Sequence, residues 1–163
     1  MKKITLITLL IISSVSMLKA QDYKSALGLR VNQWYGGITY KYFVAPTTAW
    51  DLTLSSDFEN GATLTALYEK HVPIVGAPGL SWYYGPGFHV GLWGEGDNSL
   101  IDLGLDGVIG LEYSVNEIPF AFSVDYIPSV NLRIGDGSGV NGNFRNWSFG
   151  VKYTFGKVII TSK

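Results

Sequence analysis

The chain has 163 residues, which is enough for one domain but not for two comfortable ones. Its formal net charge is −1, so no basic surface suggests a nucleic-acid partner. It has no cysteine, which excludes a disulfide framework, a thiol nucleophile, a cysteine zinc site and lipoprotein acylation. Charged residues make up 15% of the chain, against about 25% in ordinary globular proteins, while 47% of its residues are hydrophobic.

The N-terminus predicts a cleaved secretory signal peptide over residues 1–20. Lys2 and Lys3 precede an apolar run over about 4–18, and the small Ala20 suits cleavage before Gln21. A membrane anchor would need about 20 apolar residues, and this run is shorter and contains threonines and serines. The mature chain is then a single exported domain over 21–163.

From Tyr23 onward, apolar and polar residues alternate, which is the pattern of strands with one apolar face. Eight strands of about ten residues are expected, the length of a tilted membrane-spanning strand. They lie near 23–32, 38–44, 49–55, 63–71, 80–92, 101–114, 120–134 and 147–155. No helical pattern separates them, so the strands should form hairpins in an antiparallel up-and-down order.

The connections between these strands alternate in character. Those near 45–47, 73–79 and 115–118 are compact, whereas those near 56–61, 93–100 and 135–143 are rich in glycine, asparagine and aspartate. Short periplasmic turns and longer outer loops are typical of a membrane barrel with both termini in the periplasm. The short connection near 34–37 is an exception to this rule. Pro86 and Pro128 fall inside strands, where we expect β-bulges.

The charged residues gather on the face opposite the large apolar side chains. A soluble lipocalin-like barrel, which is the alternative fold, would turn the apolar face inward and carry denser charge outside. The charged face is also rich in glycine, which suits the crowded interior of a narrow barrel. We therefore expect an all-β, eight-stranded transmembrane β-barrel with a lumenal polar network. That network comprises Arg30, Lys41, Asp51, Glu69, His89, Asp102, Asp106, Glu112, Asp125 and Lys152, with Arg133 on the same face.

Charges inside such a barrel must be paired, because an isolated buried charge is very costly. Lys41 and Asp51 are equidistant from the turn centred on Pro46, so the hairpin should place them opposite each other. Lys152 should likewise reach Asp125 on the neighbouring strand.

Aromatic residues mark the ends of several strands. Trp50, Trp82 and Trp147 are expected at the lipid interface, where aromatic side chains gather. Gly150, Tyr153 and Phe155, in the segment 148–155, resemble the C-terminal insertion signal of bacterial outer-membrane barrels. An unknown extracellular ligand could bind a patch of loop aromatics, formed by Trp34, Tyr35, Phe58, Trp93 and Phe144. The alternative is that these side chains belong to the upper aromatic girdle.

Catalysis would require a nucleophile, a base and an orienting carboxylate within reach of one another. The histidines are His71 and His89, and neither is followed two residues later by the serine of lipid A deacylases. We therefore expect no catalytic residues, and two histidines with scattered carboxylates predict no metal site and no cofactor. An open pore is also not expected, because eight strands leave an interior filled by side chains.

Several motifs resemble those of a family of small outer-membrane β-barrel proteins of Gram-negative bacteria, with the OmpA/OmpX-type architecture. They are GLR at 28–30, GITYKYF at 37–43, LYEKH at 67–71, LSWYYGPGFH at 80–89, GVIGLEY at 107–113 and IPF at 118–120. The resemblance covers essentially the whole mature chain and implies a fold and a location, but no established activity. One departure is the segment 156–163, which continues past the aromatic residue where such chains commonly stop.

The sequence thus predicts an integral outer-membrane barrel that is not an enzyme and has a structural or surface-interaction role. Expected partners are outer-membrane lipid and lipopolysaccharide, together with periplasmic chaperones and the barrel-assembly machinery during biogenesis. The second candidate is a lipid-modifying enzyme that uses a lumenal or rim histidine. The third is a soluble ligand-binding barrel.

Overall fold

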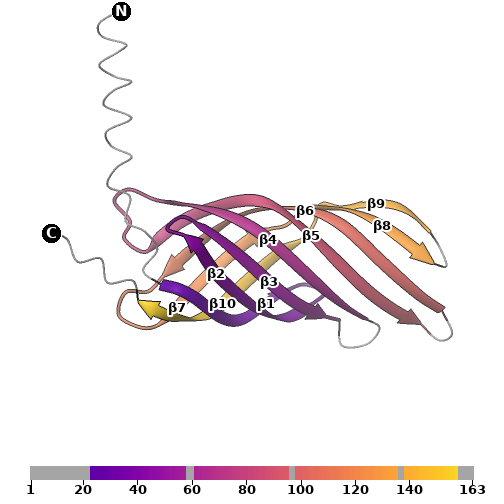
Figure 1. Ribbon diagram of the computed structural model, residues 1–163, viewed down its shortest axis with the longest axis horizontal. Helices are drawn as coiled ribbons and strands as arrows, with labels where there is room; N and C mark the ends of the chain where they lie inside the picture. The colour runs from indigo at the N-terminus through magenta and orange to yellow at the C-terminus, as the bar shows by residue number, and fades with distance from the viewer. Residues whose placement is uncertain (1–22, 58–60, 96–97, 136–137, 158–163) are drawn as a thin grey trace, which may run out of the picture.

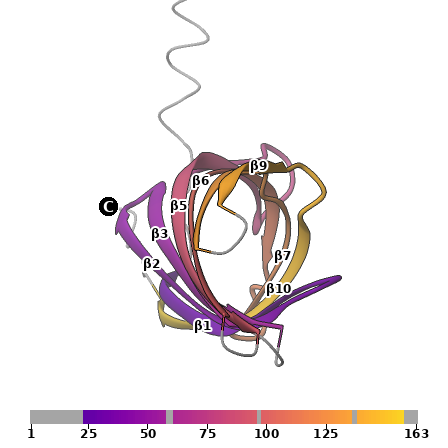
Figure 2. The same cartoon turned by 90° about the vertical axis from the view of Figure 1, so that its right-hand side faces the viewer.

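The computed structural model describes residues 23–57, 61–95, 98–135 and 138–157. These residues form a closed antiparallel β-barrel (Figures 1 and 2). Its strand segments are β1 (Tyr23–Asn32), β2 (Gly36–Ala45), β3 (Thr48–Ser56), β4 (Gly61–Pro73), β5 (Leu80–Glu95), β6 (Asn98–Ser114), β7 (Phe120–Tyr126), β8 (Ser129–Gly135), β9 (Gly139–Asn143) and β10 (Trp147–Lys157). The signal peptide expected over 1–20 and the end of the tail, 158–163, lie outside the described residues.

These segments make eight barrel strands. β1 to β6 follow one another around the wall, and β6 then pairs with both β7 and β8, which together form the seventh strand. β9 pairs with β8 while β10 pairs with β7, so β9 and β10 form the eighth. Antiparallel pairing of β10 with β1 closes the ring. The expected strand number and up-and-down order are therefore confirmed.

The two ends of the barrel differ, and they are named here by the chain. At the terminal end β1 begins and β10 ends, with Tyr23 paired with Lys157. At the loop end β5, β6, β8 and β9 extend beyond the other strands (Figure 1). Among the described residues, no helix is long and apolar enough to cross a membrane.

The prediction of a β-bulge at Pro86 is wrong. Tyr84 pairs with Lys70 and Gly87 with Leu67, so β5 passes Pro86 without a change of register. Proline lacks an amide donor, and here it interrupts the pairing with β4 without adding a residue.

The irregularity near Pro128 lies largely on the neighbouring strand. Tyr126 pairs with Trp147 and Ser129 with Asn143, so residues 127–128 face the longer segment 144–146. The register against β6 continues across Pro128, from Tyr126 opposite Ile109 to Ser129 opposite Asp106. The extra residue therefore belongs to the eighth strand, between β9 and β10.

Two of the expected loops are largely strand. β5 continues to Glu95 and β6 begins at Asn98, within the loop predicted over 93–100. β9 occupies Gly139–Asn143, within the loop predicted over 135–143. Glycine and asparagine have low strand propensity, but here a partner strand satisfies their backbone hydrogen bonds, which local composition does not reveal.

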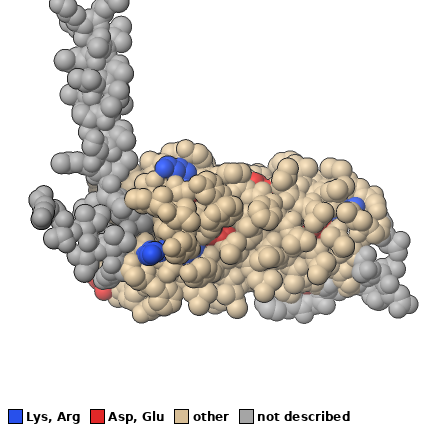
Figure 3. All heavy atoms as spheres, in the orientation of Figure 1, with Lys and Arg blue, Asp and Glu red and all other residues tan. Residues whose placement is uncertain are grey.

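The two faces of the wall differ sharply in polarity. Outward side chains are mostly large and apolar, and they are exposed, for example Leu29 at 62% and Leu105 at 74%. The surface seen in Figure 3 carries only scattered charged side chains. The inner face carries the buried charged residues and two small apolar clusters. One cluster is Tyr23, Ala26, Phe43, Ala49 and Ala121, and the other is Leu67, Tyr83, Val108 and Ile127.

Candidate functional site

Lys41 lies at the centre of a buried cluster in the terminal half of the lumen. Its Nζ is 2.7 Å from Oε2 of Glu69 and donates a hydrogen bond to Oε2 of Glu112 at 2.8 Å. The hydroxyl of Tyr23 donates to the other oxygen of Glu112, at 2.7 Å. Nζ of Lys41 also lies 4.5 Å from the ring centroid of Tyr83. This Lys41 cluster brings together β1, β2, β4, β5 and β6, so it fills the barrel from wall to wall.

Asp51 and Arg30 form the centre of a second buried layer. Arg30 donates to both carboxylate oxygens of Asp51 at 3.2 Å, and Thr39 donates to Oδ1 at 2.6 Å. The Nε of Arg30 lies 3.2 Å from Oδ2 of Asp125, which also accepts a hydrogen bond from Ser148. Arg30 thereby links two carboxylates, an arrangement that fits its planar fork of donors.

One expected ion pair is found and the other is replaced. Lys41 and Asp51 are directly opposite in the β2–β3 register, with 3.7 Å between Nζ and Oδ2. The expected pair of Lys152 with Asp125 is wrong, because Nζ of Lys152 lies 3.4 Å from Asp51 instead. Adjacent strands suggested Asp125, but the side chain of Lys152 extends across the lumen, while Arg30 takes Asp125.

The loop half of the lumen is polar but incompletely filled. There, His89 and Asp106 approach to 2.9 Å between Nδ1 and Oδ1, and Arg133 lies 3.8 Å from Asp102. A cavity of about 380 Å³ opens at this end. Its lining residues come from most of the wall: Arg30, Asn32, Tyr35, Thr53, Ser55, Thr63, Thr65, His89, Trp93, Asp102, Asp106, Ile127, Ser129, Asn131, Arg133, Asn141, Gly142, Asn143, Asn146 and Ser148.

Tyr35, in the turn between β1 and β2, forms part of the cavity wall. Partial burial raises the pKa of its hydroxyl, and the nearby carboxylate of Asp57 acts in the same direction. The hydroxyl is therefore neutral at physiological pH and can donate a hydrogen bond.

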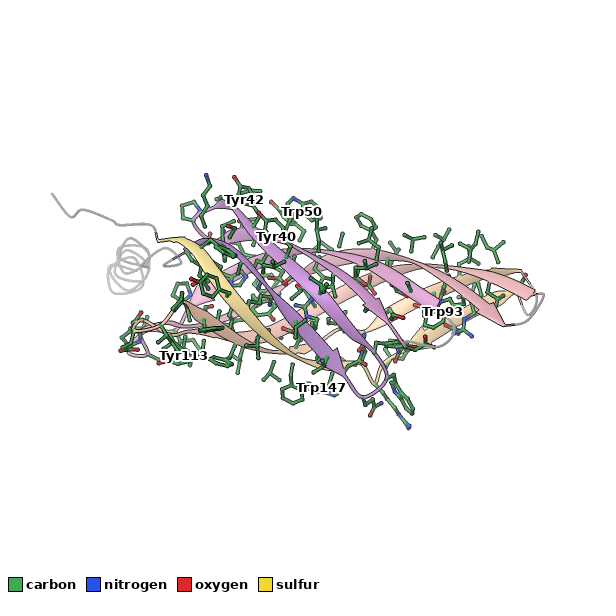
Figure 4. All side chains as sticks on the ribbon, turned by 90° about the horizontal axis from the view of Figure 1, so that it is seen from below. Tyr40, Tyr42, Trp50, Trp93, Tyr113 and Trp147 are labelled. Atoms are coloured by element: carbon green, nitrogen blue, oxygen red, sulfur yellow. The ribbon has the colours of Figure 1, made fainter. Side chains whose placement is uncertain are left out.

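The predicted interface tryptophans are outward, whereas two of the expected loop aromatics, Tyr35 and Trp93, line the cavity. Trp50, Trp82 and Trp147 are exposed on the outer wall, and Figure 4 shows Tyr40, Tyr42 and Trp50 close together there. Trp93, expected in an outer loop, lies in β5 and lines the cavity. Its strand continues past the predicted loop boundary, so the inward alternation of His89 and Gly91 reaches Trp93 as well. Phe58 of the same expected patch lies outside the described residues.

The expected insertion signal lies on the closing strand. Gly150 is buried on the inner face, whereas Tyr153 and Phe155 are exposed on the outer face, 4.9 Å apart between ring centroids. Phe120 on β7 packs edge-on against Tyr153. β10 extends two residues beyond Phe155, to Lys157.

Several participants escaped the sequence analysis. Tyr23 and Tyr83 belong to the Lys41 cluster, and Asn131 and Asn141 line the cavity. Alternation along the strand places Tyr83 on the inner face, but the sequence does not indicate that its ring contacts Lys41. Asn141 lies in a segment predicted as loop, where alternation could not be applied.

His71 has neighbours that resemble a hydrolytic triad. Its Nε2 is 3.0 Å from Glu69, and its Nδ1 is 3.5 Å from the hydroxyl of Ser81. All three side chains are buried, and none of them lines the cavity. The three side chains are therefore buried beside the Lys41 cluster, apart from the residues that line the cavity.

His89 faces the cavity, with its Nδ1 held by Asp106. An activated nucleophile would need a hydroxyl bonded to the other ring nitrogen. Among the described residues, no hydroxyl forms a hydrogen bond with Nε2 of His89. The described residues likewise contain no group of three or more histidine, cysteine or acidic side chains placed to hold a metal ion.

Comparison of the chain with protein-family models, with curated proteins and with solved structures finds no match. The closed eight-stranded antiparallel barrel is compatible with a small β-barrel family.

Proposed function

We propose that this protein is an integral outer-membrane β-barrel of a Gram-negative bacterium, exported by its signal peptide. Its role is structural or one of surface interaction, and it is not an enzyme. The terminal end faces the periplasm and the loop end faces outward, with lipid and lipopolysaccharide around the wall. Chaperones and the barrel-assembly machinery are its partners during biogenesis.

The observation that carries this proposal is the inverted polarity of the wall. Asp51, Glu69 and Lys41 are completely buried, while leucines, valines and aromatics around the outside are exposed. Monomeric soluble proteins rarely expose contiguous apolar patches larger than a few hundred Å². An apolar exterior with a polar interior is the arrangement of transmembrane barrels. A soluble lipocalin-like barrel would bury its apolar face, so this polarity argues against that alternative.

Aromatic contacts around the terminal end support the proposed location in a membrane. Trp50 packs on Tyr68 and Trp82 stacks on Tyr84, at 5.0 and 5.1 Å between ring centroids. Tyrosine and tryptophan are enriched where the hydrocarbon core meets the head groups. A band of such side chains at the terminal end matches one interface of the bilayer.

Cell fractionation tests the location. We expect the mature protein in the outer-membrane fraction, resistant to carbonate extraction, with gel mobility that changes on heating because the folded barrel resists detergent. Full recovery in the soluble periplasmic fraction without detergent would exclude the membrane barrel.

Lipid A analysis tests the absence of enzymatic activity separately. Mass spectra of lipid A should be unchanged whether the gene is present, deleted or overexpressed. Gain or loss of an acyl chain that follows expression would instead establish the lipid-modifying alternative. His89→Ala is the variant to compare in that case, because His89 lines the open cavity whereas His71 does not.

A further inference from the structure

The cavity at the loop end contains buried acceptors that have no donor. Oδ1 of Asp102 and Oδ1 of Asn131 have no hydrogen-bond partner in the described parts of the chain. Both residues line the cavity, and both are more than nine-tenths buried, at 6% and 8% exposure. They lie on the neighbouring strands β6 and β8, where Asp102 pairs with Arg133 and Asn131 with Gly104. A buried acceptor is costly unless a donor reaches it, so this wall is suited to a molecule that supplies donors.

The charges around the cavity largely compensate one another. Arg30 is held by Asp51 and Asp125 beneath the cavity, and Arg133 lies near Asp102. His89 is held by Asp106. Among the described residues that line the cavity, no cluster of one sign is left over to attract a strongly charged ligand. The other polar walls are hydroxyls and amides, among them Thr63, Ser129, Asn141 and Asn146.

An aromatic side chain completes one wall. Trp93 lines the cavity and packs against Tyr35, with ring centroids 5.7 Å apart at an angle of 60°. Gly91 leaves room for this inward indole, because a Cβ there would lie 2.8 Å from Nε1 of Trp93. An aromatic side chain combines an apolar body with a polar group, which suits a ligand with both C–H faces and hydroxyls.

We propose that this cavity binds a neutral, hydroxyl-rich molecule about the size of one or two sugar rings. Its volume of about 380 Å³ lies near the lower end of the range of small-molecule sites, about 300–1,000 Å³. Rotation of the Asp102 and Asn131 side chains presents their buried oxygens to ligand hydroxyls, and Trp93 covers an apolar face of the ring. The proposal goes beyond the membrane role and is independent of it, because a soluble barrel of this structure would have the same cavity.

Binding can be measured on the full mature chain folded in a zwitterionic detergent, because alkyl-glycoside detergents carry a sugar head group that would compete. Glucose, N-acetylglucosamine and maltose are titrated separately into the millimolar range by calorimetry, with tryptophan fluorescence as a second readout. We expect saturable binding of at least one of them. Asn131→Ala should weaken it about tenfold, as expected for one lost hydrogen bond in a closed site. Trp93→Phe should remove the fluorescence change while retaining binding.

The matched control is Asn116→Ala, which removes the same side chain from the exposed turn at the terminal end and should leave affinity unchanged. Folding of every variant is checked by heat-modifiable mobility. If Asn131→Ala does not fold, Asp102→Asn replaces it and should also weaken binding, because a charged acceptor forms the stronger hydrogen bond. Absence of saturable binding by all three sugars would overturn the proposal. The proposal would also be overturned if substitution of Asn131 and of Asp102 left the sugar affinity unchanged. Binding of spermidine or inorganic phosphate in place of the sugars would overturn it as well.

Discussion

Lys41 on β2 and Glu112 on β6 meet inside the barrel, with 2.8 Å between Nζ and Oε2. β2 and β6 are not neighbours in the wall, since each is hydrogen-bonded to other strands. The contact therefore forms only when the sheet has curled into a ring. It couples the closure of the barrel to the neutralisation of two buried charges.

Lys41→Met should destabilise the barrel strongly, because it leaves Glu69 and Glu112 buried without their shared cation. Removing one partner of a buried ion pair typically costs about 3–5 kcal/mol. Urea unfolding of the protein refolded into lipid vesicles measures the change. The control is Lys70→Met, at an exposed position whose ammonium contacts Thr47. Equal stability of the two variants would show that the Lys41 cluster contributes little.

Asp51→Ala should also destabilise the barrel, for a different reason. It leaves the positive charges of Arg30 and Lys152 facing each other in the lumen with one carboxylate fewer. We expect a loss of about 3 kcal/mol or more in the free energy of unfolding. Glu117→Ala, at an exposed turn, is the matched removal of a carboxylate and should have little effect. A urea midpoint close to that of the parent would count against the buried network.

Gly28→Ala tests the close approach of the first and last strands. A Cβ at Gly28 would collide with the carbonyl oxygen of Val151 across the closing pair of strands. Overpacking of this kind costs about 1–3 kcal/mol, and here it acts where the barrel closes. Gly139→Ala is the control, since a Cβ there meets nothing within 4 Å. Heat-modifiable mobility and urea unfolding should separate the two variants.

Val151→Arg tests whether the outer wall faces lipid. Val151 lies on β10 midway between the outward aromatics Trp147 and Phe155. An arginine facing the middle of a bilayer costs about 2–4 kcal/mol. Val75→Arg, in a turn where Val75 is 90% exposed, should change stability by less than about 0.5 kcal/mol. If both variants unfold from vesicles at the urea concentration of the parent, the wall does not face lipid.

Tyr153→Ala and Phe155→Ala test the proposed insertion signal. Each should slow the appearance of the folded, heat-modifiable form in pulse-labelled cells, because each removes an aromatic side chain from the closing strand. Phe88→Ala is the control, an equally outward aromatic on β5. If both variants assemble at the same rate as this control, the segment 148–155 is not an insertion signal.

The alternation of side chains was sufficient to predict the eight barrel strands, their order and the inward face. Arg30, Asp51 and Glu69 are buried where that alternation placed them. Local composition was misleading at β9 and at the junction of β5 and β6, where glycine and asparagine indicated loops. Those segments are strands because a neighbouring strand pairs with their backbone. The composition of the segment itself does not reveal that pairing.

The sequence by itself determined which side of each strand is polar, because a period of two is a property of consecutive residues. Only the tertiary structure decided which charges meet. Ring closure brings Lys41 to Glu112 and Lys152 to Asp51. These residues lie on strands that are not hydrogen-bonded to each other, so strand pairing alone does not predict their contacts. The tertiary structure also decided that the lumen is filled at the terminal end and open at the loop end. That difference arises because long charged side chains converge at one end, while the shorter asparagines, serines and threonines leave space at the other.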